Sequence, residues 1–186
     1  MNFIIAGIGL LILSAWNKMQ AKGNDTPTIN NWDTGNFRQN ILQWRNIINE
    51  ELIKFPKAVK KLSEIDILTF IYVESAGNPN ATAKDGEHGL MQVIERFAYA
   101  DAVNNGRIKD YSYQQMIHSP RLQINAGIAY LDVIIEKLGE STDLRDVVRS
   151  YNGGYGRFKN GDTNYSQAYV DNWLSKREKI QQWQIN

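Results

Sequence analysis

Apolar residues recur at three- and four-residue steps along most of the chain, a spacing that predicts a mainly α-helical protein. In residues 37–55 they line one face of a helix expected to end near Pro56. A second helix, over residues 59–73, closes in an almost continuous apolar run. Because no segment alternates apolar and polar residues over strand length, the pattern leaves room only for a small hairpin within residues 79–89.

Helix start and stop signals are clearest in the second half of the chain. Ser119-Pro120 is an N-cap followed by a proline at the first helical position, and Gly139 is placed to end that helix. Asp143 begins the next helix, which Gly153 stops. A last helix starts near Ser166.

The N-terminus differs from the rest of the chain, because residues 3–16 are apolar and uncharged. No lysine or arginine precedes this run, while Lys18 and Lys22 follow it. An atypical signal peptide, a short uncleaved membrane anchor, or an apolar tail buried in a larger assembly would each fit. We therefore expect an apolar segment over residues 1–16, a polar linker over 17–36 and one domain over 37–186.

Composition excludes several classes of function. The net charge of +1 gives no basic field for nucleic acid, so no nucleic-acid partner is expected. The absence of cysteine excludes a disulfide framework, a thiolate nucleophile and a zinc–thiolate site. The two histidines, His88 and His118, lie too far apart in sequence to show a metal-ligand spacing. We expect neither a metal nor a cofactor.

Glu74 stands where a helix should stop, after the apolar run 67–73 and before Gly77 and Pro79. A carboxyl there meets the negative end of the helix dipole and apolar neighbours, and both raise its pKa. A carboxylic acid that keeps its proton near neutral pH suits protonation of a glycosidic leaving oxygen. The plainer interpretation is a solvated surface glutamate, which is what most helix glutamates are.

Two further motifs accompany this glutamate, Gly89-Leu90-Met91-Gln92-Val93 and Tyr151-Asn152-Gly153-Gly154. Each also has a purely structural interpretation: the first motif would be a helix start with a packed methionine, and the second a helix stop followed by a glycine turn. On the functional interpretation, the Gln92 amide faces sugar hydroxyl and N-acetyl groups, because an amide both donates and accepts. A tyrosine hydroxyl from the second motif would fix the Glu74 carboxyl, and its glycines would let a polymer approach closely.

Together with Glu74-Ser75-Ala76-Gly77-Asn78-Pro79, these motifs resemble those of the soluble lytic transglycosylase family, the relatives of goose-type lysozyme. Gly127-x-x-Tyr130-Leu131 and Tyr169-Val170 extend the resemblance, which covers residues 37–183. It implies a lysozyme-like domain that cuts the β-1,4 bond between N-acetylmuramic acid and N-acetylglucosamine in peptidoglycan glycan strands. Glu74 would be the single acid and base, with a 1,6-anhydro product and no metal or cofactor. The residues implied to bind the sugar are Ser75, Met91, Gln92, Tyr151, Asn152 and Tyr169.

Alternatives remain open at this point. Asp85 and Glu87 are the next acids along the chain after Glu74, and one of them at roughly 6.5–9.5 Å from Glu74 would permit an inverting, lysozyme-type hydrolysis. A non-catalytic wall-binding component of an envelope-spanning machine or a virion is the competing class. The expected location is the periplasmic side of the cell envelope, with membrane association through residues 3–16, or a phage virion. Departures from the family pattern at His88, Gln123, Ser150 and Gly153 concern binding detail.

Overall fold

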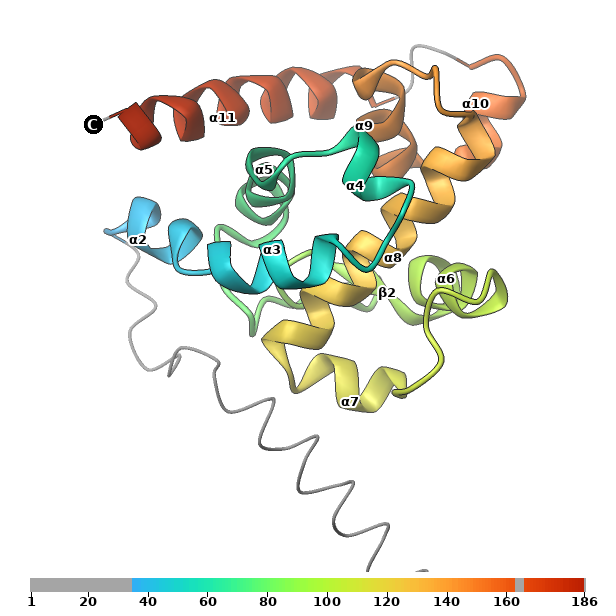
Figure 1. Cartoon of the computed structure of the whole chain (residues 1–186), viewed down its shortest axis with the longest axis horizontal. Coiled ribbons are helices and arrows are strands. Elements are labelled where there is room, and N and C mark those ends of the chain that lie inside the picture. The colour runs from blue at the N-terminus through green and yellow to red at the C-terminus, as the bar shows by residue number, and fades with distance from the viewer. Residues whose placement is uncertain (1–34, 163–165, 186) are drawn as a thin grey trace, which may run out of the picture. The chain divides into compact units, whose positions relative to one another are not determined.

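The computed structural model describes residues 35–162 and 166–185 (Figure 1). The predictions for the apolar segment 1–16 and for linker residues 17–34 lie outside this range. The helices are α2 (Phe37–Leu42), α3 (Arg45–Leu52), α4 (Ala58–Lys61), α5 (Glu64–Ser75), α6 (Ala100–Asn104), α7 (Tyr113–Ile117), α8 (Pro120–Leu138), α9 (Leu144–Gly153), α10 (Tyr155–Lys159) and α11 (Gln167–Ile185), with one π-helical turn, η2 (Glu95–Tyr99). Two short strands, β1 (Glu87–His88) and β2 (Val93–Ile94), pair antiparallel.

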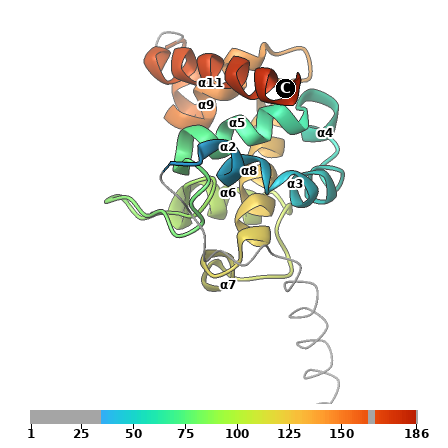
Figure 2. The same cartoon turned by 90° about the vertical axis from the view of Figure 1, so that its left-hand side faces the viewer.

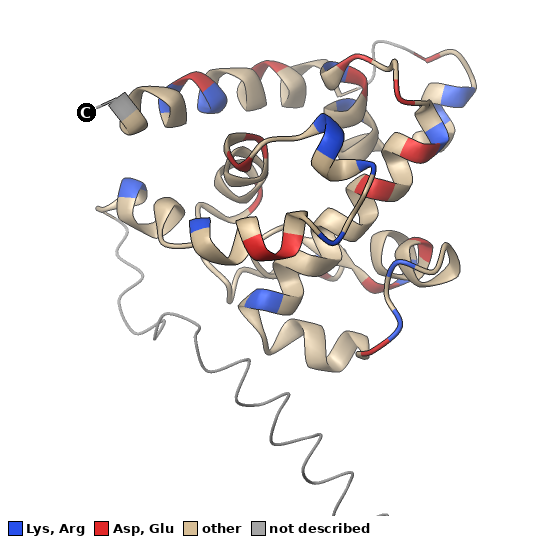
Figure 3. Cartoon of the chain, in the orientation of Figure 1, with Lys and Arg blue, Asp and Glu red and all other residues tan. Residues whose placement is uncertain are grey.

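Helix α8 is central and packs against α3, α4, α6, α7 and α9 (Figure 1). Helix α5 packs against α3 and α11, and α11 lies across α5 and α9 (Figure 2). The core between these layers contains Trp44, Phe70 and Trp173, none of which is exposed to solvent. Acidic and basic positions are interspersed along the helices rather than gathered on one element (Figure 3). The mainly helical prediction is thus confirmed, and α5, which carries Glu74, packs against both α3 and α11.

The single helix predicted over residues 37–55 is wrong in detail, because the structure divides it into α2 and α3. Trp44 lies at the break with φ −84° and ψ −5°, which interrupts the regular helical ladder. The break places the Trp44 indole in the core, where its Nε1–H donates to the carbonyl of Gly77 at 3.3 Å. The helix is therefore interrupted at the residue whose side chain contacts the turn that follows α5.

The helix predicted over residues 59–73 is also divided, at an extended Leu62 that separates α4 from α5. Ser63 then caps α5 in a capping box, accepting from the backbone of Asp66 while the Asp66 carboxylate accepts from the Ser63 amide. The S-x-x-D spacing was readable in the sequence, and it gives the true start of the helix. The hairpin expected within residues 79–89 is present in part, as an antiparallel bridge between Thr82 and His88, and residues 87–88 pair in addition with residues 93–94 beyond that range.

Other helix boundaries follow the sequence signals. Ser119 caps α8 with proline at its first position, and Gly139 is its C-cap. Asp143 caps α9, which runs through Gly153 and ends at Gly154, one residue later than predicted. The turn η2 and the short helices α6, α7 and α10 were not predicted, because segments of about five residues show too little periodicity to be recognised.

Three buried carboxylates connect the layers, and each has partners. Asp132 of α8 accepts from the backbone amides of Lys57 and Ala58 and from the guanidinium of Arg107. Glu51 of α3 accepts from Arg121 and Asn125 of α8, and Asp66 of α5 accepts from Arg177 of α11. Buried charges are tolerated only when paired in this way. The pairs therefore fix how α3, α5 and α11 sit around the core.

Gly77 is the glycine for which we expect substitution to cost most. Its φ is +83°, and an added Cβ would overlap the backbone carbonyl of Asn40, which cannot move aside without shifting α2. We expect Gly77→Ala to lower the free energy of unfolding by about 2–4 kcal/mol in urea denaturation, from left-handed strain plus overpacking. Gly86→Ala is the matched control, because Gly86 has φ +92° with open space around it and tests the strain alone. Equal losses in the two variants would show that the contact with Asn40 contributes nothing.

Candidate active site

Glu74 lies in the last turn of α5, immediately before the chain leaves the helix. Ala76 ends the helix in the left-handed conformation, φ 53° and ψ 27°, and Gly77 continues with a positive φ. The predicted glycine cap is therefore wrong by one residue, since alanine takes the C-cap position. Gly77 is needed instead for its close approach to α2. The reversal turns the chain away and leaves the Glu74 side chain facing a pocket.

Ser75 connects the end of α5 to the turn that carries Gln92. Its hydroxyl lies 2.8 Å from the carbonyl of Leu90 and 3.1 Å from that of Ile71, and it accepts from the amide of Gly77 at 3.2 Å. It does not line the pocket. The predicted sugar-binding residue is thus placed where it holds two parts of the site together.

Met91 and Gln92 face opposite ways from the same turn. Met91 is fully buried and packs on Gly127 of α8, where any Cβ would overlap its sulfur. Gln92, at φ 48°, lines the pocket and donates its amide N–H groups to the carbonyls of Gly89 and Ala81 at 2.8 and 3.1 Å. These bonds orient the side chain with its carbonyl oxygen left for a ligand donor.

Two tyrosines flank Glu74 from different helices. Tyr169 of α11 donates a short hydrogen bond to Oε1 of Glu74. Tyr151 of α9 lines the pocket, and its hydroxyl donates to the carbonyl of Met91 at 2.7 Å. The tyrosine that fixes the carboxyl was expected from the 151–156 turn, whereas the structure supplies it from the last helix. Asn152 also borders the pocket, and its Oδ1 accepts from the hydroxyl of Ser166.

Burial raises the pKa of Glu74 from its ordinary value of 4.5 to about 7. The hydrogen bond from Tyr169 opposes this shift because it stabilises the carboxylate, and the negative charge of Glu87 adds to it. Glu74 therefore keeps its proton to a much higher pH than an ordinary glutamate does. A raised pKa in a pocket is a recognised mark of a functional acid.

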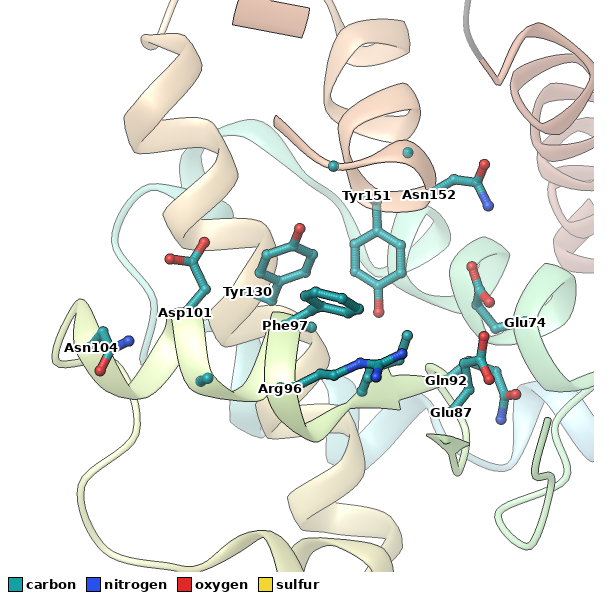
Figure 4. A pocket seen from close by; sticks show the side chains of 15 residues that line it. Glu74, Glu87, Gln92, Arg96, Phe97, Asp101, Asn104, Tyr130, Tyr151 and Asn152 are labelled. Carbon is teal, nitrogen blue, oxygen red and sulfur yellow. The ribbon is translucent and has the colours of Figure 1, made fainter. Parts of the chain in front are cut away.

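The pocket has a volume of about 650 Å³ and is lined by fifteen residues (Figure 4). Glu74, Gln92, Tyr151 and Asn152 of the predicted site meet there, whereas Ser75, Met91 and Tyr169 support it from behind. Among residues 35–162 and 166–185, no three His, Asp or Glu side chains converge as metal ligands would. The geometry is that of an acid held in a pocket wide enough for a sugar chain.

Residues 51–173 match the family model of the transglycosylase SLT domain, which covers well over half of the chain. The chain belongs to this family. The SLT chain is 27% identical over 148 residues to membrane-bound lytic murein transglycosylase E of Buchnera aphidicola subsp. Acyrthosiphon pisum, an alignment that covers 78% of the chain and 63% of that protein. It is 30% identical over 100 residues to membrane-bound lytic murein transglycosylase C of Photorhabdus laumondii subsp. laumondii, covering 51% of the chain and 28% of that protein.

A solved structure shares the fold of the SLT chain. The 70 kDa soluble lytic transglycosylase of Escherichia coli superposes with a TM-score of 0.64 and 21% identity, over 76% of the SLT chain and 24% of the other. The family-model match confirms the predicted family, and this superposition confirms the predicted helical lysozyme-like fold. The chain spans under two thirds of the length of these relatives. Across the described part of the SLT chain, no helix combines the length and apolar character needed to cross a bilayer.

Sequence reasoning missed the half of the pocket built by η2 and α6. Glu87 was noted only as a nearby acid, and the structure places it in the pocket while Asp85 is not among the lining residues. Arg96 and Phe97 lie in a segment with no predicted element, so no periodicity indicated which side chains face inward. An arginine next to a phenylalanine carries no spacing that could have identified them.

Two substitutions should move the pKa of Glu74 in opposite directions. Glu87→Gln removes a negative charge and should lower that pKa, so the alkaline limb of the kcat/KM profile moves to lower pH. Tyr169→Phe removes a bond to the carboxylate and should move the limb to higher pH. The pH dependence of wall cleavage, measured for both variants beside the unmodified protein, checks the signs. Shifts in the same direction would contradict this assignment of causes.

Proposed function

We propose that this SLT chain is a peptidoglycan lytic transglycosylase that cuts the β-1,4 bond between N-acetylmuramic acid and N-acetylglucosamine. The observation that carries the proposal is the Glu74 carboxyl, which faces the pocket with a pKa of about 7 and is held by Tyr169. The names of the two murein transglycosylase relatives support the same substrate class.

The hydrogen bond from Tyr169 decides which oxygen of Glu74 acts as the acid. Oε1 accepts from the tyrosine hydroxyl, so the proton of the neutral carboxyl resides on Oε2. No side chain or backbone group in the described ranges bonds Oε2. Glu74 would therefore donate its proton from Oε2 to the glycosidic oxygen as the bond breaks. Tyr169 keeps the carboxyl in this orientation throughout.

The second half of the reaction returns the proton. In the proposed sequence the N-acetyl group of the muramoyl unit stabilises the reacting carbon, and its N–H is a suitable donor for the free carbonyl oxygen of Gln92. The Glu74 carboxylate then takes the proton of the 6-hydroxyl as that oxygen closes the 1,6-anhydro ring. Bond breaking is thus matched by bond making at the same carbon, and Glu74 ends the cycle protonated.

A lysozyme-type hydrolase is the second candidate, favoured by Glu87 in the pocket. Glu87 would act as the base that activates water, while Glu74 remained the acid. The carboxylate of Glu87 already accepts from the amide of Asp85 at 3.0 Å, which holds it at the pocket wall. The two functions give different products from the same substrate.

Mass spectrometry of the fragments released from purified sacculi tests the proposal. Anhydro-muropeptides are the expected products, and reducing ends would favour hydrolysis with Glu87 as base. Glu87→Gln separates the two further, since a transglycosylase keeps its product type in this variant and a hydrolase loses activity. Failure of the unmodified protein to clear a suspension of sacculi would favour a non-catalytic wall-binding component.

The proposed setting of the domain is the periplasmic side of the cell envelope, with residues 1–16 as an apolar anchor and residues 17–36 as linker. The support for this arrangement from the relatives is that two of them are named membrane-bound lytic murein transglycosylases. Membership of a virion or of an envelope-spanning complex is the alternative that the apolar segment also fits. Retention of the protein in membranes after carbonate washing is the expected outcome for an anchor.

A further inference from the structure

The pocket continues past Glu74 along η2 and α6, and the proposed reaction uses none of this part. We call its side chains the distal wall; they are Arg96, Phe97, Asp101, Asn104 and Tyr130. Arg96 and Phe97 extend from η2 into the pocket, with the guanidinium of Arg96 directed toward the end that holds Gln92 and Glu87 (Figure 4). The distal wall is thus continuous with the catalytic end.

Arg96 is the one lysine or arginine among the fifteen lining residues. Its guanidinium carbon lies 4.9 Å from the centre of the Phe97 ring, a cation–π distance. Within the two described ranges, no carboxylate forms an ion pair with it. The positive charge is therefore held over an aromatic face and remains available to a ligand.

The three acids of the pocket have partners other than Arg96. Both carboxylate oxygens of Asp101 bond Lys137 of α8, at 2.7 and 2.9 Å. Glu74 accepts from the hydroxyl of Tyr169, and burial raises its pKa, which reduces its negative charge near neutral pH. Glu87 accepts from a backbone amide instead. An anionic group entering beside Phe97 would therefore meet a guanidinium to which no carboxylate of the described residues is bonded.

Phe97 adds an apolar surface at the same place. Its side chain is 58% exposed, which is unusual for a phenylalanine and costs free energy unless a ligand covers it. The C–H face of a sugar ring is a matching partner for an exposed aromatic face. Arg96 and Phe97 together therefore suit a sugar that carries a negative charge.

We propose that Arg96, held over Phe97, binds a carboxylate borne by the muramoyl units of the glycan and so selects anionic over neutral amino-sugar polymers. This inference rests on the proposed function, because it assumes a glycan strand in this pocket. Muramoyl units differ from N-acetylglucosamine by a lactyl group, which ends in a carboxylate in bare strands and in an acidic stem peptide in native strands. The planar fork of arginine binds carboxylates through two parallel N–H groups.

Binding to a variant that cannot cleave provides the test. In a Glu74→Gln background, calorimetry compares three ligands of equal length: glycan fragments with stem peptides, the same fragments stripped by an amidase, and neutral chito-oligosaccharides. Arg96→Gln should weaken binding of carboxylate-bearing fragments about 10- to 100-fold, the usual effect of losing a charge-assisted hydrogen bond. Binding of chito-oligosaccharides should change less than about twofold. Arg96→Lys should recover part of the loss, because it restores the charge but not the fork.

Arg145→Gln is the matched control, since it removes one exposed positive charge outside the pocket. If Arg96→Gln loses affinity only for stem-bearing fragments, the bound group is a peptide carboxylate. If it loses affinity only for stripped fragments, the bound group is the lactyl carboxylate. A loss of affinity for both kinds of fragment means that either carboxylate reaches Arg96. The proposal would be overturned if Arg96→Gln weakened the binding of charged and neutral ligands equally, or weakened neither. It would also be overturned if Arg96→Gln, made in the otherwise unmodified protein, shifted the pH profile of kcat/KM. Absence of cleavage by the unmodified protein would count against the proposed function alone, because the binding measurements do not require turnover.

Discussion

Glu74→Gln should abolish clearing of purified sacculi, with kcat/KM lower by about 10²–10⁴-fold or more. The amide keeps the size and the hydrogen bond of the carboxyl, because its oxygen still accepts from Tyr169. It cannot deliver a proton to the leaving oxygen, so only binding remains. Release of soluble fragments over time measures the loss. Glu178→Gln, an exposed glutamate of α11, is the matched control and should retain full activity.

The same variant should be at least as stable as the unmodified protein, and the difference should depend on pH. The pKa of Glu74 is about 7 in the folded chain and near 4.5 when unfolded, so ionisation disfavours folding as pH rises between these values. Glutamine does not ionise, so its advantage in Tm should grow from pH 4.5 to above pH 7. A variant that lost activity by unfolding would instead show a lower Tm at every pH. Full clearing by a folded Glu74→Gln would contradict the proposed acid.

Asp132→Ala should cause the largest loss of stability, about 3–5 kcal/mol, because it leaves buried partners without an acceptor. Asp132 is fully buried in α8 and accepts from the amides of Lys57 and Ala58, at the start of α4, at 2.7 and 2.8 Å. It also accepts from Arg107 at 2.9 Å. Removing it leaves two amides and the Nε–H of Arg107 without this acceptor, while Arg107 keeps its bonds to Glu136 and to the carbonyl of Asn105. Thermal unfolding should report a Tm lower by about 10 °C or more.

Asp110→Ala is the control for this experiment. Asp110 is exposed, so this substitution removes the same carboxylate group from the surface. It should change Tm by no more than about 2 °C. Because Asp132 lies outside the pocket, folded Asp132→Ala protein at low temperature should still yield the same products. An unchanged Tm in Asp132→Ala would mean that the buried carboxylate contributes no net stability.

The helical class and several boundaries of this SLT chain were predictable because they depend on local chemistry. Ser119 caps α8 and Asp143 caps α9, where a side-chain oxygen next to an apolar run satisfies free amides. The break at Trp44 was not predictable, because a distant partner, the carbonyl of Gly77, sets it. The break at Leu62 had a local signal, the capping box of Ser63 and Asp66, but the apolar spacing runs across it. Apolar spacing alone continues through such breaks, so it predicts longer helices than the fold contains.

For the candidate site, the sequence by itself indicated Glu74 as the candidate acid, since a glutamate at a helix end followed by a reversing turn is a local arrangement. Only the tertiary structure decided which groups act on that acid. Tyr169 is 95 residues away, and α11 brings it to Glu74 by packing across α5. Glu87, Arg96 and Phe97 reach the pocket through β1 and η2, elements too short to show a pattern. The choice of Glu74 as the proposed acid thus follows from local sequence, whereas its pKa and the charge of its pocket depend on contacts that exist only once the chain has folded.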